Sequence, residues 1–159
     1  MYKRQALDQA IEILEKAFDL AKTKDQETLG LAGAIYKRKW ETDGIKVHLE
    51  LSLIYYNRGY KQGIEGDKGY TAINAAYILD LLAYLEQKQA AKLGVSSSVA
   101  TKRRKDAVKI REEIIGFLSE HLKESGKAQQ GEPVYWPLAT MAEACFGTKQ
   151  YAEAGKWLK

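Results

Sequence analysis

Residues 135–158 read YWPLATMAEACFGTKQYAEAGKWL, and their pattern of side chains is the strongest indication of the fold. Large and small side chains recur along it at spacings of three and four residues, the period of one face of an α-helix. Small residues such as Ala142 and Ala154 let two helices approach closely, while larger neighbours fill the space beside them. We therefore expect a tight helical hairpin packed through Leu138, Met141, Ala142, Cys145, Tyr151, Ala154 and Leu158.

Two earlier segments repeat the pattern of the first helix of this hairpin. They are Leu29-Ala32-Gly33-Tyr36 and Tyr70-Ile73-Asn74-Tyr77. The corresponding small positions are unevenly spaced, with 41 residues from Gly33 to Asn74 and 68 from Asn74 to Ala142. Compact repeats of two helices recur at about 34 residues. The pattern therefore predicts elongated, irregular hairpins stacked as a solenoid.

The spacing of apolar residues along the whole chain predicts seven helices. Their expected ranges are 5–23, 27–40, 46–62, 68–90, 99–124, 134–146 and 150 to the end. Asp25 is expected to cap the second helix, residues 94–98 form the clearest linker, and 125–133 form a polar loop. The expected buried stripes include Leu7, Ile11, Leu14, Phe18 and Ala21 in the first helix and Tyr70, Ile73, Tyr77, Leu81 and Tyr84 in the fourth.

The segment after Asp43-Gly44 allows two interpretations. Apolar and polar residues alternate along it, at Ile45, Val47, Leu49, Leu51 and Leu53. Taken alone, this alternation is typical of a β-strand behind a turn. The same residues also form two adjoining helical stripes, and the sequence has no second alternating segment for a strand to pair with. Because an unpaired strand leaves its backbone polar groups unsatisfied, we expect a helix over 46–62.

Composition is that of an ordinary globular protein. Hydrophobic residues make up 45% of the 159 residues and charged residues 29%, a balance that supports a packed core. The single cysteine, Cys145, excludes an internal disulfide and suits a reducing compartment. The longest nearly apolar run, 70–85, contains Asp80 and is shorter than the ~20 residues of a membrane span. We expect one cytoplasmic domain over 1–159 with no membrane partner, and an end in mid-pattern suggests a piece of a longer protein.

Three stretches resemble one protein family. Residues 27–37 read ETLGLAGAIYK, 69–76 read GYTAINAA, and 135–144 read YWPLATMAEA. The first two resemble the hallmark segments of the TRAF-binding-type tetratricopeptide domain, known from apoptosis signal-regulating MAP kinase kinase kinases and from bacterial proteins. The third fits the later part of that domain. The family commonly has an arginine where Ala34 stands and a glycine where Ala72 stands, so no role of that arginine can be transferred.

The resemblance implies an all-α, right-handed α-solenoid of about three elongated, irregular tetratricopeptide-like hairpins. It also implies a scaffolding and regulatory module of a signalling protein, with no catalytic activity and no cofactor. Its partner would be a protein or peptide, bound on the concave surface that the first helix of each hairpin forms. The residues expected on that surface are Glu27, Lys37, Arg38, Thr71, Ile78, Trp136 and Glu143.

Two residues in these stretches have competing interpretations. Trp136 either faces the concave surface as a rigid contact for a partner or anchors the core, and we expect the surface. Asn74 falls where the repeat has a small residue, and we expect a buried amide bonded to a neighbouring helix, with a ligand contact as the alternative. Tyr36 and Tyr70 are expected to pack in the interior with bonded hydroxyls.

A basic stretch at the start of the expected fifth helix suggests binding of a nucleic acid as an alternative function. Its cations are Lys102, Arg103, Arg104, Lys105, Lys109 and Arg111. They could contact a nucleic-acid backbone, which a net charge of +4 and a pI near 9.0 permit. We favour a solvated helix face, partly balanced by Asp106, Glu112 and Glu113, and a nucleic acid is the less favoured partner.

The residue types needed for catalysis or metal binding are few. Residues 63–71 read GIEGDKGYT, but Lys68 is followed by Gly69 and Tyr70 instead of the serine or threonine of a phosphate-binding loop. The only histidines, His48 and His121, are expected on different helices. We therefore expect no catalytic residue, no bound metal and no nucleotide site.

Overall fold

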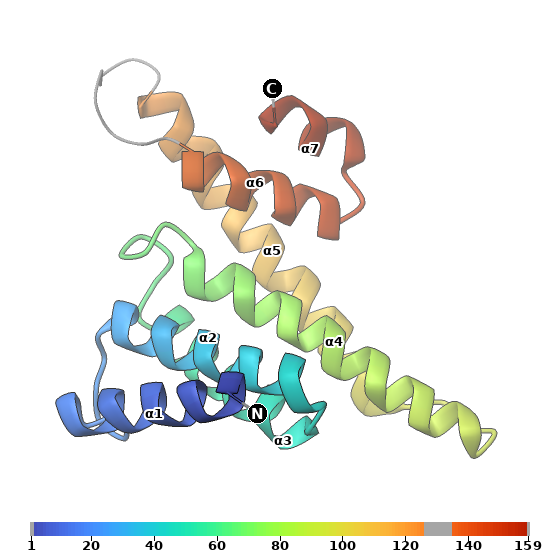
Figure 1. The fold of residues 1–159 in the computed structure, drawn as a ribbon. Helices are drawn as coiled ribbons and strands as arrows, with labels where there is room; N and C mark the ends of the chain where they lie inside the picture. Colours follow the sequence, from blue (N-terminus) through green and yellow to red (C-terminus); the bar gives the residue numbers. More distant parts are fainter. Residues whose placement is uncertain (1, 126–134, 159) are drawn as a thin grey trace.

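The computed structural model describes residues 2–125 and 135–158, which form seven α-helices and no β-strand (Figure 1). The helices are α1 (Tyr2–Ala17), α2 (Gln26–Asp43), α3 (Lys46–Tyr60), α4 (Tyr70–Lys92), α5 (Ser98–Ser125), α6 (Tyr135–Gly147) and α7 (Tyr151–Trp157). The all-helical fold is confirmed, as is the choice of helix over strand after Asp43. The loop predicted over 125–133 lies outside the described residues except at its first position.

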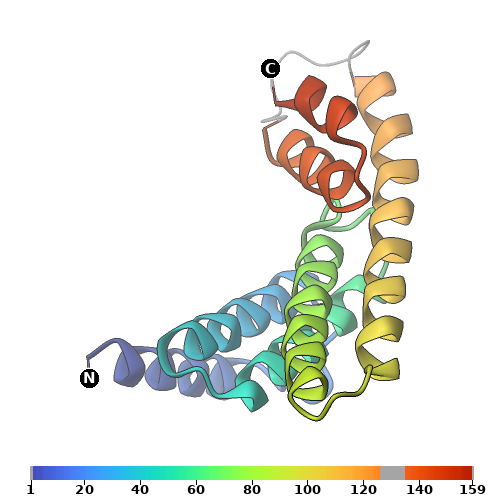
Figure 2. The same ribbon diagram turned by 90° about the vertical axis from the view of Figure 1, so that its right-hand side faces the viewer.

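The helices after α1 pair as three consecutive hairpins, α2–α3, α4–α5 and α6–α7, and α1 packs on α2. The first helices of the hairpins also contact one another in the order α2, α4, α6. The middle hairpin is long, with helices of 23 and 28 residues, and the last is short, with helices of 13 and 7. In Figure 2 the N-terminal helices and the α6–α7 hairpin extend to the same side of α4 and α5, so the molecule is bent around one open face.

Side-chain caps fix where two of the first helices begin. The Asp25 carboxylate accepts a hydrogen bond of 2.7 Å from the Thr28 amide, which confirms Asp25 as the N-cap of α2. At the start of α4, Asp67 accepts from the Gly69 amide at 3.0 Å and from the Thr71 amide at 2.8 Å. Gly44, at φ 68°, ends α2 in the left-handed conformation that glycine adopts without strain.

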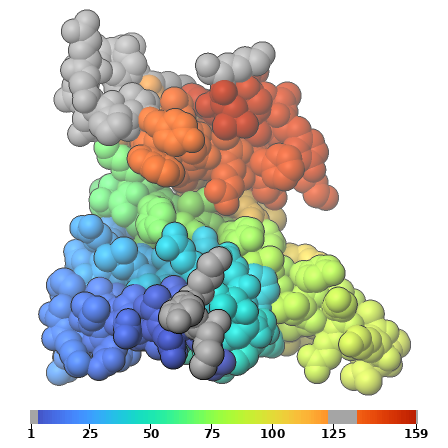
Figure 3. Space-filling model, in the orientation of Figure 1, coloured from blue at the N-terminus to red at the C-terminus, as the bar shows by residue number. Residues whose placement is uncertain are grey.

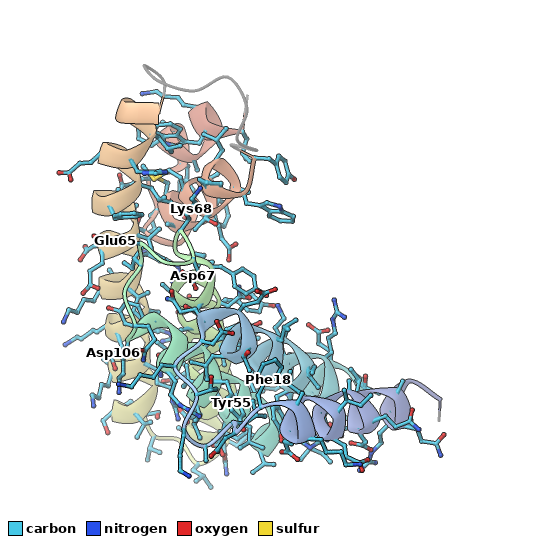
Figure 4. The ribbon with its side chains drawn as sticks, turned by 90° about the vertical axis from the view of Figure 1, so that its left-hand side faces the viewer. Phe18, Tyr55, Glu65, Asp67, Lys68 and Asp106 are labelled. Atoms are coloured by element: carbon cyan, nitrogen blue, oxygen red, sulfur yellow. The ribbon has the colours of Figure 1, made fainter. Side chains whose placement is uncertain are left out.

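Helix α1 ends six residues before the predicted position, at Ala17. Asp19 explains the early end, because its carboxylate accepts from the Ala21 amide at 3.1 Å and its carbonyl accepts from Lys22 and Thr23, which turns the chain. Leu20 is buried by this turn, whereas Phe18 and Ala21, predicted in the buried stripe, are exposed. Phe18 instead lines a cleft of about 650 Å³ that Tyr55 of α3 also lines (Figure 4).

Small residues lie at the closest helix crossings. Gly33 of α2 packs against the fully buried Tyr56 ring of α3, and its carbonyl accepts a 2.8 Å hydrogen bond from the Ser52 hydroxyl. Gly59 of α3 packs against Thr71 of α4 in the same way. A larger side chain at either glycine would meet the opposite helix.

In the last hairpin, Met141, Ala142, Cys145 and Ala154 are buried, as the opening pattern predicts. Burial raises the pKa of the Cys145 thiol. Tyr151 and Leu158, predicted to pack with them, are exposed instead. The reason is that α7 contacts only α6 among the described helices, so that its other face has no neighbour.

Candidate functional site on the first helices

Each first helix exposes one stripe of side chains on the open face of the molecule, where α2, α4 and α6 lie in order (Figures 1 and 3). The stripe of α2 is mainly charged, with Glu27, Leu31, Arg38 and Glu41. Those of α4 and α6 are mainly aromatic. We call their six exposed rings the aromatic face, which consists of Tyr70, Tyr77, Tyr84, Tyr135, Trp136 and Phe146.

The tyrosines of α4 belong to this face and not to the core, which corrects the stripe predicted from sequence. Tyr70, Tyr77 and Tyr84 follow one another at seven residues, two helical turns apart, and each is exposed. Helix α4 is surrounded by α2, α3, α5 and α6, so most of its circumference is buried. The close contacts are made by alanines and aliphatic residues, namely Ala72, Ile73, Ala75, Ala76, Ile78, Leu79, Leu82 and Ala83.

A polar cluster joins α2 to α4 in the middle of the open face. The Lys37 ammonium donates to the Asn74 side-chain oxygen at 3.3 Å and lies 5.7 Å from the centre of the Tyr77 ring. The Asn74 amide nitrogen donates in turn to the Tyr70 carbonyl at 2.9 Å. Asn74 is therefore hydrogen-bonded as expected, but it is only half-buried. These contacts connect the Lys37 side chain of α2 to Asn74 and Tyr77 of α4.

Trp136 projects from the first turn of α6 and is 71% exposed. The neighbouring Tyr135 ring meets the indole edge to face, with ring centres 5.2 Å apart, and is exposed as well. Pro137 is the residue of this turn that packs inward. The expectation that Trp136 faces the surface agrees with this exposure.

Two of the seven residues predicted on the concave surface are inside the protein. Thr71 is fully buried, because its hydroxyl donates to the Asp67 carboxylate at 2.6 Å and its methyl group packs on Gly59. Ile78 is fully buried in the main core. Neither side chain can contact a partner, and both predictions are wrong. The others reach the surface, at Glu27, Lys37, Arg38, Trp136 and Glu143.

Glu143 lies close to two cations from other helices. Loss of water around its carboxylate raises the pKa of Glu143, and the positive charges of Arg111 and Lys37 offset that effect only in part. Arg111 is itself buried and donates to the Asp80 carboxylate at 2.7 Å. A cationic ligand would favour the charged form of the Glu143 carboxylate and would therefore oppose the effect of this loss of water.

The basic stretch of α5 offers fewer free cations for binding than the sequence predicts. Arg111 of α5 is not exposed, because its side chain packs against Asp80 of α4 and against the backbone of Gly147 at the end of α6. Arg103 donates to both oxygens of Glu86, at 3.1 and 2.9 Å. Lys102, Arg104, Lys105 and Lys109 are exposed.

In the glycine-rich segment between α3 and α4, the carboxylate of Asp67 occupies the amide donors that a phosphate-binding loop would offer to a phosphate. The Asp67 carboxylate binds the amides at the start of α4, below α6 (Figure 4). A phosphate would need those same donors. Within residues 2–125 and 135–158, no group of three His, Cys, Asp or Glu side chains could hold a metal ion. No helix in the same ranges is long and apolar enough to cross a membrane.

Comparison with known proteins finds a family match for the N-terminal half of the chain. The family model described as Tetratricopeptide Repeats-Sensor matches residues 1–82, just over half of the sequence. No curated protein and no solved structure matches the chain. The matched residues include α1, the α2–α3 hairpin and the first half of α4, where the small-residue crossings at Gly33 and Gly59 lie. The chain therefore belongs to the Tetratricopeptide Repeats-Sensor family.

Proposed function

We propose that this chain binds a protein or peptide through the aromatic face, since domains of the tetratricopeptide type generally mediate contacts between proteins. In this proposal the chain acts as a regulatory scaffold within a larger cytoplasmic signalling protein and not as an enzyme. The observation that carries the proposal is the set of six exposed rings on α4 and α6, two first helices that contact each other.

Exposed aromatic rings in this arrangement suit recognition of a partner. Tyrosine and tryptophan bury a large area at a small loss of side-chain freedom, and both are enriched among the residues that dominate binding energy. A cleft of about 670 Å³ opens beside Tyr70, between the starts of α2 and α4, and Leu31 and Glu27 also line it. Such a cleft could receive one side chain of the partner, with apolar contact at Leu31 and Tyr70 and polar contact at the other lining residues.

We also propose that the chain is related to TRAF-binding-type domains. Two of the three stretches that carry the resemblance, 27–37 and 69–76, lie within the residues that match the family model. They contain Glu27 and Leu31 of α2 and Tyr70 at the start of α4, which line the cleft. A regulatory role within a signalling protein is consistent with that resemblance.

The nucleic-acid alternative has less support. Two of its six cations, Arg103 and Arg111, already bind carboxylates of α4. A phosphate backbone would have to compete with Glu86 and Asp80 for them.

A displayed peptide library selected against the whole chain tests the proposed function. We expect selected peptides to lose affinity for Tyr77→Ala and Trp136→Ala, each by about tenfold or more. Ile54→Ala is the matched control, since Ile54 is an exposed apolar residue on α3, outside the aromatic face. Peptides whose affinity depends on Ile54 and not on Tyr77 or Trp136 would refute the proposed site.

A further inference from the structure

The tip of the α4–α5 hairpin projects beyond α1–α3 (Figures 1 and 3). It carries exposed aliphatic side chains. Leu93 is 75% exposed, and Val95 and Val99 are each more than half exposed. These residues, together with Ala90, line a hollow of about 390 Å³ at the tip. Aliphatic side chains at a projecting turn add nothing to the hairpin core, and together they form an apolar patch open to a partner.

The same tip is strongly basic. Residues 87–105 contain six lysines and arginines and no aspartate or glutamate. The acids that border this stretch are Glu86 and Asp106. Glu86 is bound by Arg103 and by Lys46 of α3, whereas Asp106 lies on α5 at the far end of the stretch from the turn (Figure 4). The exposed cations that remain are Lys88, Lys92, Lys102, Arg104 and Lys105.

The apolar residues lie beyond the cations along the hairpin. Lys92 ends α4 just before Leu93, and Lys105 lies seven residues into α5, about 10 Å from its start at 1.5 Å per residue. The polar layer of a bilayer is about 5–7 Å thick on each side. Side chains at the tip can therefore reach the acyl boundary while the lysines remain among the lipid phosphates.

We propose that the α4–α5 hairpin tip docks on the surface of a membrane rich in anionic lipids. Leu93, Val95 and Val99 enter the interface, and the surrounding lysines bind the headgroups. A nucleic acid would use the cations but offers no apolar layer for the three aliphatic residues beyond them. Docking of this kind needs no membrane-spanning helix, and it does not depend on the proposed binding of a protein by the aromatic face.

Sedimentation of the whole chain with lipid vesicles tests the proposal. We expect binding to phosphatidylcholine vesicles in which about a third of the lipid is phosphatidylserine, and little binding to phosphatidylcholine alone. The double change Leu93→Ser with Val95→Ser should weaken binding about tenfold or more. Lys92→Gln and Lys102→Gln should each weaken it about fivefold and reduce its sensitivity to salt. Ile13→Ser is the matched control, an exposed apolar residue on α1 whose loss should change nothing.

A fluorophore placed at the tip gives a second readout. Leu93→Cys can be labelled selectively because the native Cys145 is buried, and the emission should shift to shorter wavelength on anionic vesicles only. Failure to bind anionic vesicles, or binding that the serine changes leave intact, would overturn the proposal. Tight binding of a fluorescent oligonucleotide that requires Lys102 and Arg104 but not Leu93 would also overturn it, in favour of a nucleic-acid contact.

Discussion

Replacement of Gly59 by alanine should destabilise the protein, although alanine is the better helix former. A methyl group at Gly59 would lie 2.5 Å from the Thr71 methyl carbon and 2.8 Å from its Cβ. Thr71 cannot move away easily, because its amide and its hydroxyl both donate to Asp67 and it is fully buried. Overpacking of a core contact costs about 1–3 kcal/mol, whereas the gain in helix propensity is at most about 1 kcal/mol near a helix end. We expect a net loss of about 1–2 kcal/mol.

Gly116 provides the matched control for this measurement. It also lies within a helix, α5, but an added methyl group would meet nothing within 4 Å. Gly116→Ala should therefore stabilise the protein by about 0.5–1 kcal/mol. Thermal or urea unfolding of both variants should give opposite signs, and for a domain of this size each kcal/mol shifts Tm by about 2–4 °C. Equal stabilisation by both changes would refute the close α3–α4 crossing on which the stack of hairpins depends.

Three further changes test the ends of the molecule and the electrostatics of the open face. Trp136→Ala should leave the unfolding free energy within about 0.5 kcal/mol of wild type while weakening a selected peptide by about 2 kcal/mol, and a large fall in the denaturation midpoint would place the indole in the core. Ala154→Leu should cost about 1–3 kcal/mol in urea unfolding, and an unchanged midpoint would contradict the packing of α7 on α6. Glu143→Gln should raise stability at neutral pH, because the folded state raises the pKa of Glu143 and so disfavours its charge. That gain should vanish as pH falls below the ordinary glutamate pKa, where both states are protonated, and a gain independent of pH would contradict the loss of water around the carboxylate.

The existence of the helices could be predicted because the period of three and four persists along each of them. Segment 46–60 shows why period alone is insufficient: its alternating residues also place Leu49, Leu53 and Tyr56 on one buried helical stripe, and Val47 and Ile54 on the exposed side. The residue at which α1 ends could not be predicted from the apolar pattern, because the apolar spacing continues past Ala17. Arg58, 35 to 38 residues away, donates to the carbonyls of Leu20, Ala21 and Thr23 and stabilises the turn.

The direction in which α4 presents its side chains was harder to predict than its existence. Large aromatic residues usually mark the buried face, but α4, which four other helices enclose, buries alanines and aliphatic residues such as Ala72, Ala75 and Ile78 and leaves its tyrosines exposed. The heptad spacing of the three tyrosines showed in the sequence that they share one face of α4, but it did not show whether that face is buried or exposed. Phe146 carried no such signal, since its exposure follows from its position at the end of α6.

The repeat pattern predicted that the candidate site lies on the first helices, but it did not predict which individual side chains of those helices are exposed. Thr71 and Ile78 each lie next to an exposed tyrosine in sequence, and one position along a helix rotates a side chain by about 100°. An error of one position along the helix therefore moves a predicted contact residue from the open face into the core.

Proton–nitrogen correlation spectra of the indole groups can follow the binding of a partner to the aromatic face. The chain has three tryptophans, Trp40, Trp136 and Trp157, and Trp136 is the one on the aromatic face. On titration with a library-selected peptide, the Trp136 signal should move together with the backbone signals of α2, α4 and α6, while the half-buried Trp40 and Trp157 signals stay in place. A stationary Trp136 signal, with the changes confined to α3 and α5, would contradict recognition of a protein through the first helices.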